Sequence, residues 1–255
     1  MGTVSYIHAK PDRKRLVKIE KLKPSLSIVI PILNEEKSLP SLLNDIGRIQ
    51  RSLNGKVEFI IVDGGSSDRS VELCERAGVT VLHSAAGRGR QIAAGAEAAS
   101  GECLLFLHAD CRLTEEHCRT AVERLRHPEL VAGGFTLRFD ASHPILRFAE
   151  GVNKIRFRLT RIFYGDHGIF LRRETYTRIG GMPEQALFED IEFSRKLKRY
   201  GRVEMVPLPL TTSARRFRAG GVLRTYLKMA TMHILYWLGV SAERLARWYQ
   251  KGARP

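Results

Sequence analysis

Short apolar runs alternate with amphipathic stretches through the first half of the chain. Four runs rich in branched aliphatic residues have the length and composition of buried strands, namely residues 26–31, 57–62, 79–82 and 103–108. Between and after them, segments with apolar side chains at helical spacing occupy residues 34–46, 68–77, 89–99 and 114–126. This alternation predicts β-α-β units built around a parallel sheet.

The second half of the chain is less regular. Strands are expected at residues 131–139, 168–172 and 203–206, and helices at residues 144–161 and 190–200. No linker rich in proline, glycine or serine interrupts the chain before residue 210. We therefore expect a basic N-terminal extension (residues 1–24), one α/β domain (residues 25–215) and a basic helical tail (residues 216–255).

Three polar segments directly follow predicted strands. In parallel sheets, ligands bind beyond the carboxyl ends of the strands. Residues 31–35, 63–68 and 108–110 would therefore lie along one edge of the sheet. The glycines after Asp63 let a ligand approach the main chain, and the Asp63 carboxylate can accept hydrogen bonds from a base or a ribose. An ordinary strand-to-helix turn explains this segment at least as well.

Asp110 has two interpretations. A carboxylate at the end of a strand can hold Mg²⁺ or Mn²⁺ against a diphosphate, because hard cations prefer oxygen ligands and share them with phosphates. The same residue could cap the following helix. Arg88 and Arg90 lie near a helix start, where they could bind phosphates or remain solvated. The Gly87-Arg-Gly pattern lacks the third glycine of a dinucleotide fingerprint, which disfavours a dehydrogenase.

Two further polar segments interrupt apolar ones. Glu189 and Asp190 begin a predicted helix, where the helix dipole favours acidic residues. A carboxylate beside a reacting centre can also take the proton of an acceptor hydroxyl. The chemistry of Gly165-Asp-His-Gly168 alone does not decide its role.

Together these motifs resemble glycosyltransferase family 2. The resemblance is carried over about residues 26–215 by Ile28-Val-Ile-Pro-Ile-Leu-Asn-Glu35, Val62-Asp-Gly-Gly-Ser-Ser-Asp68, His108-Ala-Asp110 and Glu189-Asp190. The chain looks closest to a bacterial subgroup with Gly-Arg-Gly-Arg-Gln, Leu-His-Ala-Asp and Tyr-Gly-Asp-His-Gly blocks. The resemblance implies the GT-A fold, a Rossmann-like, mixed and mainly parallel sheet flanked by helices.

The resemblance also implies roles for single residues. Asp190 matches the catalytic base, and Asp110 matches the last acid of the Asp-x-Asp metal motif, with Mn²⁺ or Mg²⁺ as the cofactor. Asp166 and Glu189 would lie on the acceptor side. The nucleotide would contact Pro31, Asn34, Glu35, Asp63, Arg88, Gln91, His108, Ala109, Arg215 and Arg216.

One departure from the family pattern concerns the metal. His108 stands where the usual motif begins with Asp, and a neutral imidazole lowers the charge available to a hard cation. The implied reaction is metal-assisted transfer of a hexose from a nucleoside-diphosphate sugar, a UDP-sugar, to a hydroxyl acceptor that is unidentified and could be lipid-linked. A single base on the acceptor face gives inversion.

Charge and cysteine content bear on partners and location. The chain has 42 Lys and Arg against 27 Asp and Glu, a net charge of +15, which favours anionic partners such as phosphorylated substrates, nucleic acid or an anionic membrane. Residues 1–25 carry seven basic against two acidic residues, and residues 211–255 carry nine basic residues against Glu243 alone. The four cysteines form no CxxC pair and residues 1–23 contain no apolar signal core, so we expect a cytoplasmic location.

The pattern of residues 222–240 predicts an amphipathic helix. Apolar residues recur at helical spacing at Leu223, Leu227, Ala230, Ile234 and Leu238. The uninterrupted apolar part is shorter than the roughly 20 residues that a spanning helix needs. Cationic flanks with Tyr236, Trp237 and Trp248 suit an interfacial helix on the inner face of the cell membrane. Packing on the catalytic domain or against a twin subunit is the alternative.

Two other functions stay open. A sugar-phosphate nucleotidyltransferase shares the fold class and the metal chemistry but transfers the nucleotidyl group. A basic nucleic-acid-binding protein would fit the net charge of +15. No recognised nucleic-acid motif is present, and the basic residues do not alternate with aromatic ones, so we expect no nucleic-acid partner.

Overall fold

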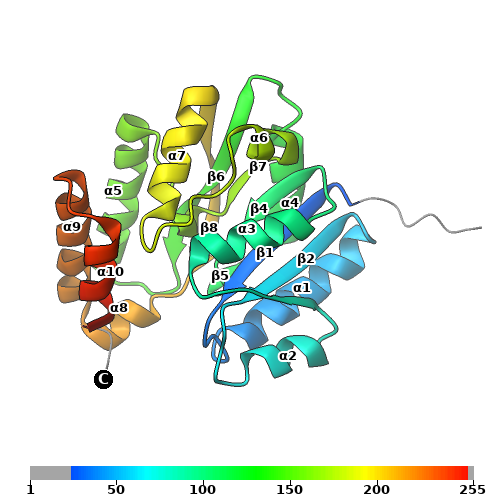
Figure 1. The fold of residues 1–255 in the computed structure, drawn as a ribbon, viewed down its shortest axis with the longest axis horizontal. Coiled ribbons are helices and arrows are strands. Elements are labelled where there is room, and N and C mark those ends of the chain that lie inside the picture. The colour runs from blue at the N-terminus through cyan, green and yellow to red at the C-terminus, as the bar shows by residue number, and fades with distance from the viewer. Residues whose placement is uncertain (1–23, 252–255) are drawn as a thin grey trace, which may run out of the picture.

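The structure, a computed structural model, describes residues 24–251 (Figure 1). The basic extension expected over residues 1–24 lies almost entirely outside them. Eight strands form one sheet in the order β3-β2-β1-β4-β7-β6-β8-β5. The first four run parallel to one another, as predicted: β1 (Leu26–Ile32), β2 (Val57–Asp63), β3 (Thr80–His83) and β4 (Cys103–Phe106).

The second half completes a mixed, mainly parallel sheet. β6 (Leu130–Phe139) and β8 (Arg202–Thr212) are parallel, whereas β7 (Ile169–Arg172) runs antiparallel to β4 and β6. The short β5 (Cys111–Arg112), which the pattern did not predict, runs antiparallel to β8. β8 extends past its predicted end at residue 206, because its distal half pairs with β6 as far as Phe139.

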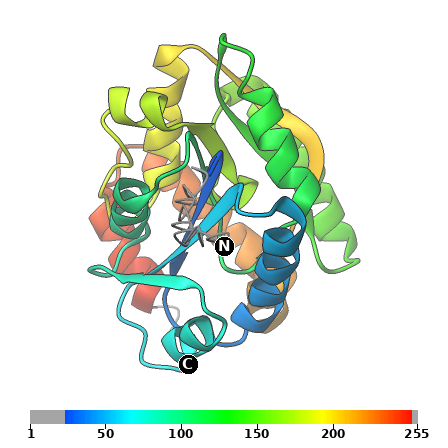
Figure 2. The ribbon, with the colours of Figure 1, turned by 90° about the vertical axis from the view of Figure 1, so that its right-hand side faces the viewer.

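Helices cover both faces of the sheet (Figure 2). One layer contains α1 (Leu39–Leu53), α2 (Ser70–Arg76) and α4 (Glu115–Arg124), and the other contains α3 (Arg88–Ala98), α6 (Arg173–Arg178) and α7 (Glu189–Tyr200). All seven residues of β1 are buried, as expected of a strand with both faces covered.

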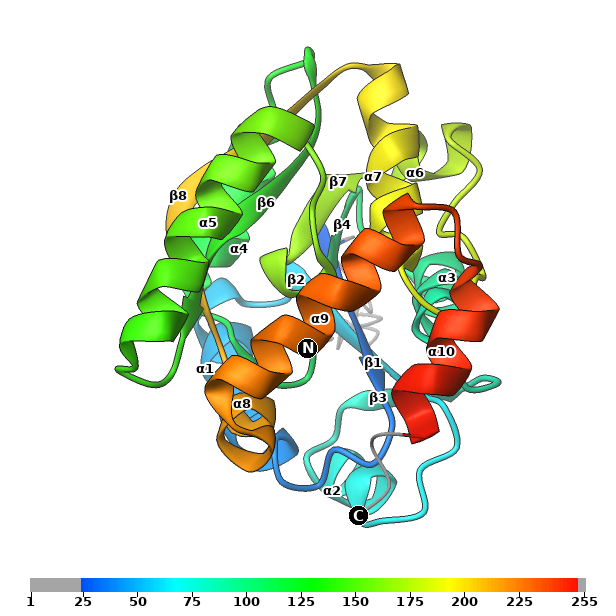
Figure 3. The same ribbon diagram turned by 90° about the vertical axis from the view of Figure 1, so that its left-hand side faces the viewer.

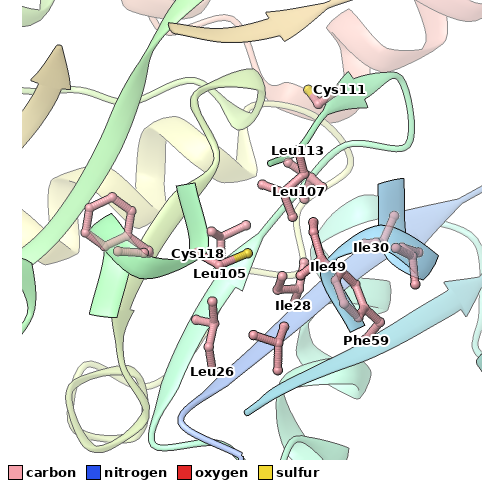
Figure 4. Close-up of a cluster of buried hydrophobic side chains, with 14 of the residues drawn as sticks. Leu26, Ile28, Ile30, Ile49, Phe59, Leu105, Leu107, Cys111, Leu113 and Cys118 are labelled. Atoms are coloured by element: carbon pink, nitrogen blue, oxygen red, sulfur yellow. The ribbon is translucent and has the colours of Figure 1, made fainter. Parts of the chain in front are cut away.

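Alternate side chains of β1 belong to the two cores. Ile28 and Ile30 join Ile49 of α1 in the cluster of Figure 4, whereas Val29 packs with the α3 side. Burying each aliphatic side chain contributes about 1.5–3 kcal/mol to the free energy of unfolding. Packing on both faces therefore fixes the position of β1 and of its carboxyl end.

The helix expected from residue 34 begins only at Leu39. Asn34 adopts a left-handed conformation (φ 55°), and the segment up to Ser38 forms a loop at the carboxyl end of β1. The backbone therefore turns towards the loop that follows β2 before the helix can start. This loop supplies several of the residues considered below.

The remaining helices lie at one end of the sheet (Figure 3). They are α5 (Pro144–Thr160), α8 (Arg215–Gly220), α9 (Val222–Trp237) and α10 (Ala242–Lys251). α9 confirms the helix predicted in the tail. Within residues 24–251, none of the helices has the length and apolarity needed to span a membrane.

Candidate active site

The loops after β1 and β2 are bonded to each other. The Asn34 main-chain N–H donates to Ser66 Oγ at 2.9 Å, and the Ser67 N–H donates to Asn34 Oδ1 at 2.8 Å. In the same turn, the N–H groups of Gly65 and Ser66 donate to the Asp63 carboxylate at 2.9 and 3.1 Å. Burial would raise the pKa of Asp63, but hydrogen bonds from Ser66 and Gly65 bring it below its usual value. Asp63 is therefore an ionised acceptor at the end of β2.

Glu35 connects this loop to the start of the tail. Arg215 Nη2 donates to both carboxylate oxygens of Glu35, at 2.6 and 2.5 Å, and Nη1 donates to Ser38 Oγ at 2.6 Å. The same guanidinium lies 3.9 Å from Asp110 Oδ2. Burial raises the pKa of Asp110 above its usual value, although Arg215 and Arg216 oppose the shift. Glu35, Asp110 and Arg215, which are far apart in sequence, thus meet at one edge of the sheet.

Four residues predicted to contact the nucleotide are buried within the protein, and Asp63, only 2% exposed, is one of them. Pro31 lies within β1, and Ala109 belongs to the core. Gln91 donates both amide protons of Nε2, to the carbonyl oxygens of Ile32 at 2.8 Å and Val62 at 2.7 Å. The side chain of Gln91 therefore holds the carboxyl ends of β1 and β2 together.

The starts of α3 and α7 meet through an ion pair. Arg88 Nε lies 2.8 Å from Oε1 of the buried Glu189. Next to it, a Cβ on Gly89 would lie 2.2 Å from the carbonyl oxygen of Pro183, so only glycine allows the two segments to approach this closely. The Gly-Arg-Gly motif thus positions the loop that leads into Glu189 and Asp190.

Asp190 is held by main-chain donors. The N–H of Gly165 donates to Asp190 Oδ2 at 2.7 Å, and the N–H of Ile191 donates to Oδ1 at 2.8 Å. Burial raises the pKa of Asp190, although Arg88 and these two bonds oppose the shift. A Cβ on Gly165 would lie 2.5 Å from His108 Nε2, so the segment that follows β4 reaches the same point. Burial also lowers the pKa of His108 well below its ordinary value, so this imidazole is neutral.

The sequence model of glycosyl transferase family 2 matches residues 27–182, more than half of the chain. The chain belongs to glycosyltransferase family 2.

Curated relatives within the family include undecaprenyl-phosphate 4-deoxy-4-formamido-L-arabinose transferases. The one from Yersinia enterocolitica is 32% identical over 163 residues, which are 60% of this chain and 49% of that protein. The one from Aeromonas hydrophila is 31% identical over 157 residues, 58% of this chain and 48% of that protein. The match thus spans about half the length of these relatives.

Solved structures with the same fold share little sequence with this family 2 chain. The mannosyltransferase PcManGT from Pyrobaculum calidifontis, in complex with GDP-Man and Mn²⁺, has a TM-score of 0.61 and 21% identity over 82% of this chain and 65% of that one. The glucosyl-3-phosphoglycerate synthase from Mycobacterium tuberculosis, in complex with Mn²⁺, UDP and glucosyl-3-phosphoglycerate, has a TM-score of 0.55 and 20% identity over 74% and 71%. The fold is GT-A, as expected.

Near Asp190, the candidate site contains residues that the sequence analysis did not single out. The Arg156 guanidinium lies 3.6 Å above the Tyr164 ring, and His233 of α9 lies 4.9 Å from the same ring on centroids. Both Arg156 and His233 interact electrostatically with Asp166, whose pKa is raised by burial. Arg156 is one of several cations on α5, so only the fold distinguishes it.

The residues around Asp110 fit a cation shared with a diphosphate. Within residues 24–251, no three His, Cys, Asp or Glu side chains form a closed metal cage. A hard cation at such a site takes one or two carboxylates from the protein and its remaining oxygens from phosphates and water. Asp110 supplies one such carboxylate, the negative charges of Glu35 and Asp166 lie nearby, and the neutral His108 does not add to them.

Proposed function

We propose that this family 2 enzyme transfers a hexose from a UDP-sugar to a hydroxyl acceptor, with inversion at the anomeric carbon. The observation that carries the proposal is the position of Asp190. Its carboxylate is fixed by the Gly165 N–H and lies near His108, which belongs to the loop that leads from β4 to Asp110. Glycosyl transfer requires a base on the acceptor side of the anomeric carbon and a carboxylate on its diphosphate side.

The donor half of the proposed site has a nucleotide end and a diphosphate end. Asp63 would accept hydrogen bonds from the base or the ribose, because its carboxylate is ionised. Asp110 would hold Mg²⁺ or Mn²⁺, which stabilises negative charge on the departing diphosphate. Arg215 and Arg216 would bind the diphosphate oxygens, and Arg215 would then exchange part of its bond to Glu35 for the ligand.

On the acceptor side, Asp190 would receive the proton of the attacking hydroxyl. A raised pKa makes a carboxylate a stronger base, and the two main-chain N–H donors keep its oxygens in place. Asp166 and Glu189 would line this side. Within the described part of the chain, Asp166 Oδ1 and Arg156 Nη2 are buried without a hydrogen-bond partner, so polar groups of an acceptor could pair with them.

The donor half is tested by hydrolysis of UDP-, GDP- and dTDP-sugars, with Mn²⁺ and with chelator. We expect turnover with a UDP-sugar that chelator abolishes. Asp110→Ala should weaken Mn²⁺-dependent UDP binding in titration calorimetry by at least about tenfold, whereas Glu174→Ala, which removes an exposed carboxylate on α6, should not. UDP binding by Asp110→Ala at wild-type strength would contradict the metal assignment. Product mass spectrometry separates this activity from nucleotidyl transfer.

The curated relatives suggest a second candidate acceptor, a polyprenyl phosphate, because undecaprenyl-phosphate is in their names. A phosphate oxygen is already ionised at neutral pH and needs no base. Asp190→Asn should therefore lower transfer to a hydroxyl by about 10²–10⁴-fold while UDP still binds, but should spare transfer to a phosphate far more. Equal transfer by the wild type and the variant to a hydroxyl acceptor would refute the role of Asp190.

We also propose that residues 216–255 contact a membrane surface peripherally on its cytoplasmic side. The support is the apolar stripe of α9, which the structure leaves exposed at Leu223, Leu227, Ile234 and Leu238. The opposite side of α9 packs on the catalytic domain through the buried Met232 and through Tyr236, whose hydroxyl donates to Glu192 Oε1 at 2.5 Å. The helix therefore has one face for the domain and one for a partner.

A further inference from the structure

Helix α5 carries a second exposed apolar stripe beside that of α9. Phe148, Ile155 and Leu159 are spaced seven and four residues apart, which places them on one side of the helix. They are 67%, 58% and 80% exposed. Leu146 and Ala149, on another side of α5, pack with Val222 and Tyr226 of α9, so the two helices are neighbours (Figure 3).

The two stripes lie on neighbouring helices, and together they are named the α5–α9 face. Its apolar members are Phe148, Ile155, Leu159, Leu223, Leu227, Ile234, Trp237 and Leu238, all between 55% and 80% exposed. Soluble monomeric proteins rarely expose contiguous apolar patches of more than a few hundred Å². A surface of this kind marks a site for a partner or a membrane.

Positive charge accompanies this surface. Lys154 and Arg158 lie on α5, and Arg224 and Lys228 lie on α9. α9 has no acidic residue, and the single acid of α5, Glu150, is held by Arg147 Nη1 and the Phe139 N–H, both at 2.7 Å. Two copies of the chain joined through this face about a twofold axis would bring like charges together, whereas an anionic bilayer complements them.

We propose that α5 and α9 together form the membrane-docking face of the enzyme, with the α5 stripe inserted into an anionic bilayer alongside that of α9. Phe188, next to Glu189 and Asp190, contacts α9 from the side opposite the bilayer, with its ring 5.0 Å from that of His233. The diameter of one helix, about 10–12 Å, then separates the acceptor half of the site from the lipid. The docking of α5 and α9 on a bilayer does not depend on the proposed function. Only the implication that the acceptor is lipid-linked rests on it.

The test uses the full-length chain and vesicles of phosphatidylcholine with or without phosphatidylglycerol. The wild type should bind the anionic vesicles, and high salt should weaken binding. The variant Phe148→Ser/Ile155→Ser/Leu159→Ser leaves the tail intact and should weaken binding by about 1,000-fold, because each of the three lost insertions costs roughly tenfold. The matched control is Tyr200→Ser, a similarly exposed aromatic residue whose hydroxyl bonds to Arg178 on α6.

Binding of the triple variant at wild-type strength would overturn the proposal, and so would equal wild-type binding to vesicles without phosphatidylglycerol. A wild-type dimer in lipid-free buffer that the triple variant dissociates would show that the face joins two copies instead. Donor hydrolysis is measured in parallel. Vesicle binding without hydrolysis would count against the proposed function alone, and hydrolysis with unimpaired binding of the triple variant would count against the α5–α9 face alone.

Discussion

The ion pair between Arg88 and Glu189 controls the charge beside the proposed base. Glu189 Oε1 lies 2.8 Å from Arg88 Nε, and its side chain is only 4% exposed, whereas that of Arg88 is 38% exposed. Arg88→Met keeps much of the side-chain length but removes the charge. Breaking a fully buried pair costs about 3–5 kcal/mol. Because solvent screens part of the Arg88 charge, we expect a loss of about 2 kcal/mol in the free energy of unfolding at neutral pH.

The size of this loss should depend on pH. Burial raises the pKa of Glu189 and of Asp190, and Arg88 lowers both. Without Arg88 both pKa values rise further, so the folded state binds protons that the unfolded chain releases. The difference in stability from the wild type should therefore be small below about pH 4, where the unfolded carboxyls are protonated, and should grow as the pH rises through the raised pKa values.

Urea unfolding of the wild type and Arg88→Met over a range of pH measures this difference. Arg90→Met is the matched control, because Arg90 is 53% exposed and lies 3.5 Å from a largely exposed Glu184. Arg88→Met/Glu189→Met should recover part of the loss, because the unpaired buried charge is gone. In transfer assays, the acid limb of the pH profile of Arg88→Met should move to higher pH. A loss that is independent of pH, or equal to that of Arg90→Met, would refute this reasoning.

Two further predictions concern the neighbours of Asp190. Gly165→Ala places a Cβ 2.5 Å from His108 Nε2 and 3.6 Å from Asp190 Oδ2, so kcat should fall about 10²-fold with little change in the urea midpoint; wild-type kcat would contradict this. His167 is fully buried, and burial lowers its pKa to about 4, so the unfolded state binds the proton first as the pH falls below about 6.5. His167 should then contribute a loss of about 1.4 kcal/mol per pH unit between about pH 6.5 and pH 4, and His167→Asn should remove that contribution from the slope in urea titrations; a slope equal to that of the wild type would count against the assignment.

The parts of the fold that the sequence predicts well are those that local burial decides. β1, β2 and β4 lie close to their predicted bounds, because strands covered on both faces read as continuous apolar runs. β5 has two residues and forms only because β8 lies beside it, so its own residues carry no pattern. α6 has only six residues and follows β7 directly. Such elements depend on tertiary pairing, which periodicity does not report.

The same distinction applies to the site. The position of Glu35 and Asp110 at one edge follows from their place after parallel strands. The pairing of Arg88 with Glu189 and the approach of His108 to Gly165 depend on contacts between segments about 60 to 100 residues apart. His233 lies off the apolar stripe of α9, which is a signal that a helical wheel could have used.

The charges of the assembled site bear on the question that His108 raised about the metal. Among the described residues, four arginines interact with five carboxylates; they are Arg88, Arg156, Arg215 and Arg216, and Glu35, Asp110, Asp166, Glu189 and Asp190. Four arginines against five carboxylates leave this partly buried region without net positive charge. A nucleoside diphosphate adds at least two negative charges, and uncompensated negative charge raises the free energy of a partly buried site. Because His108 stands in place of an acid, the site offers one ligand fewer to a cation. The other carboxylates still offset the charge of the arginines, so we expect a cation to be needed to balance the diphosphate. Donor binding should therefore weaken in chelator and recover with Mn²⁺, and indifference to chelator would show that the arginines alone neutralise the diphosphate.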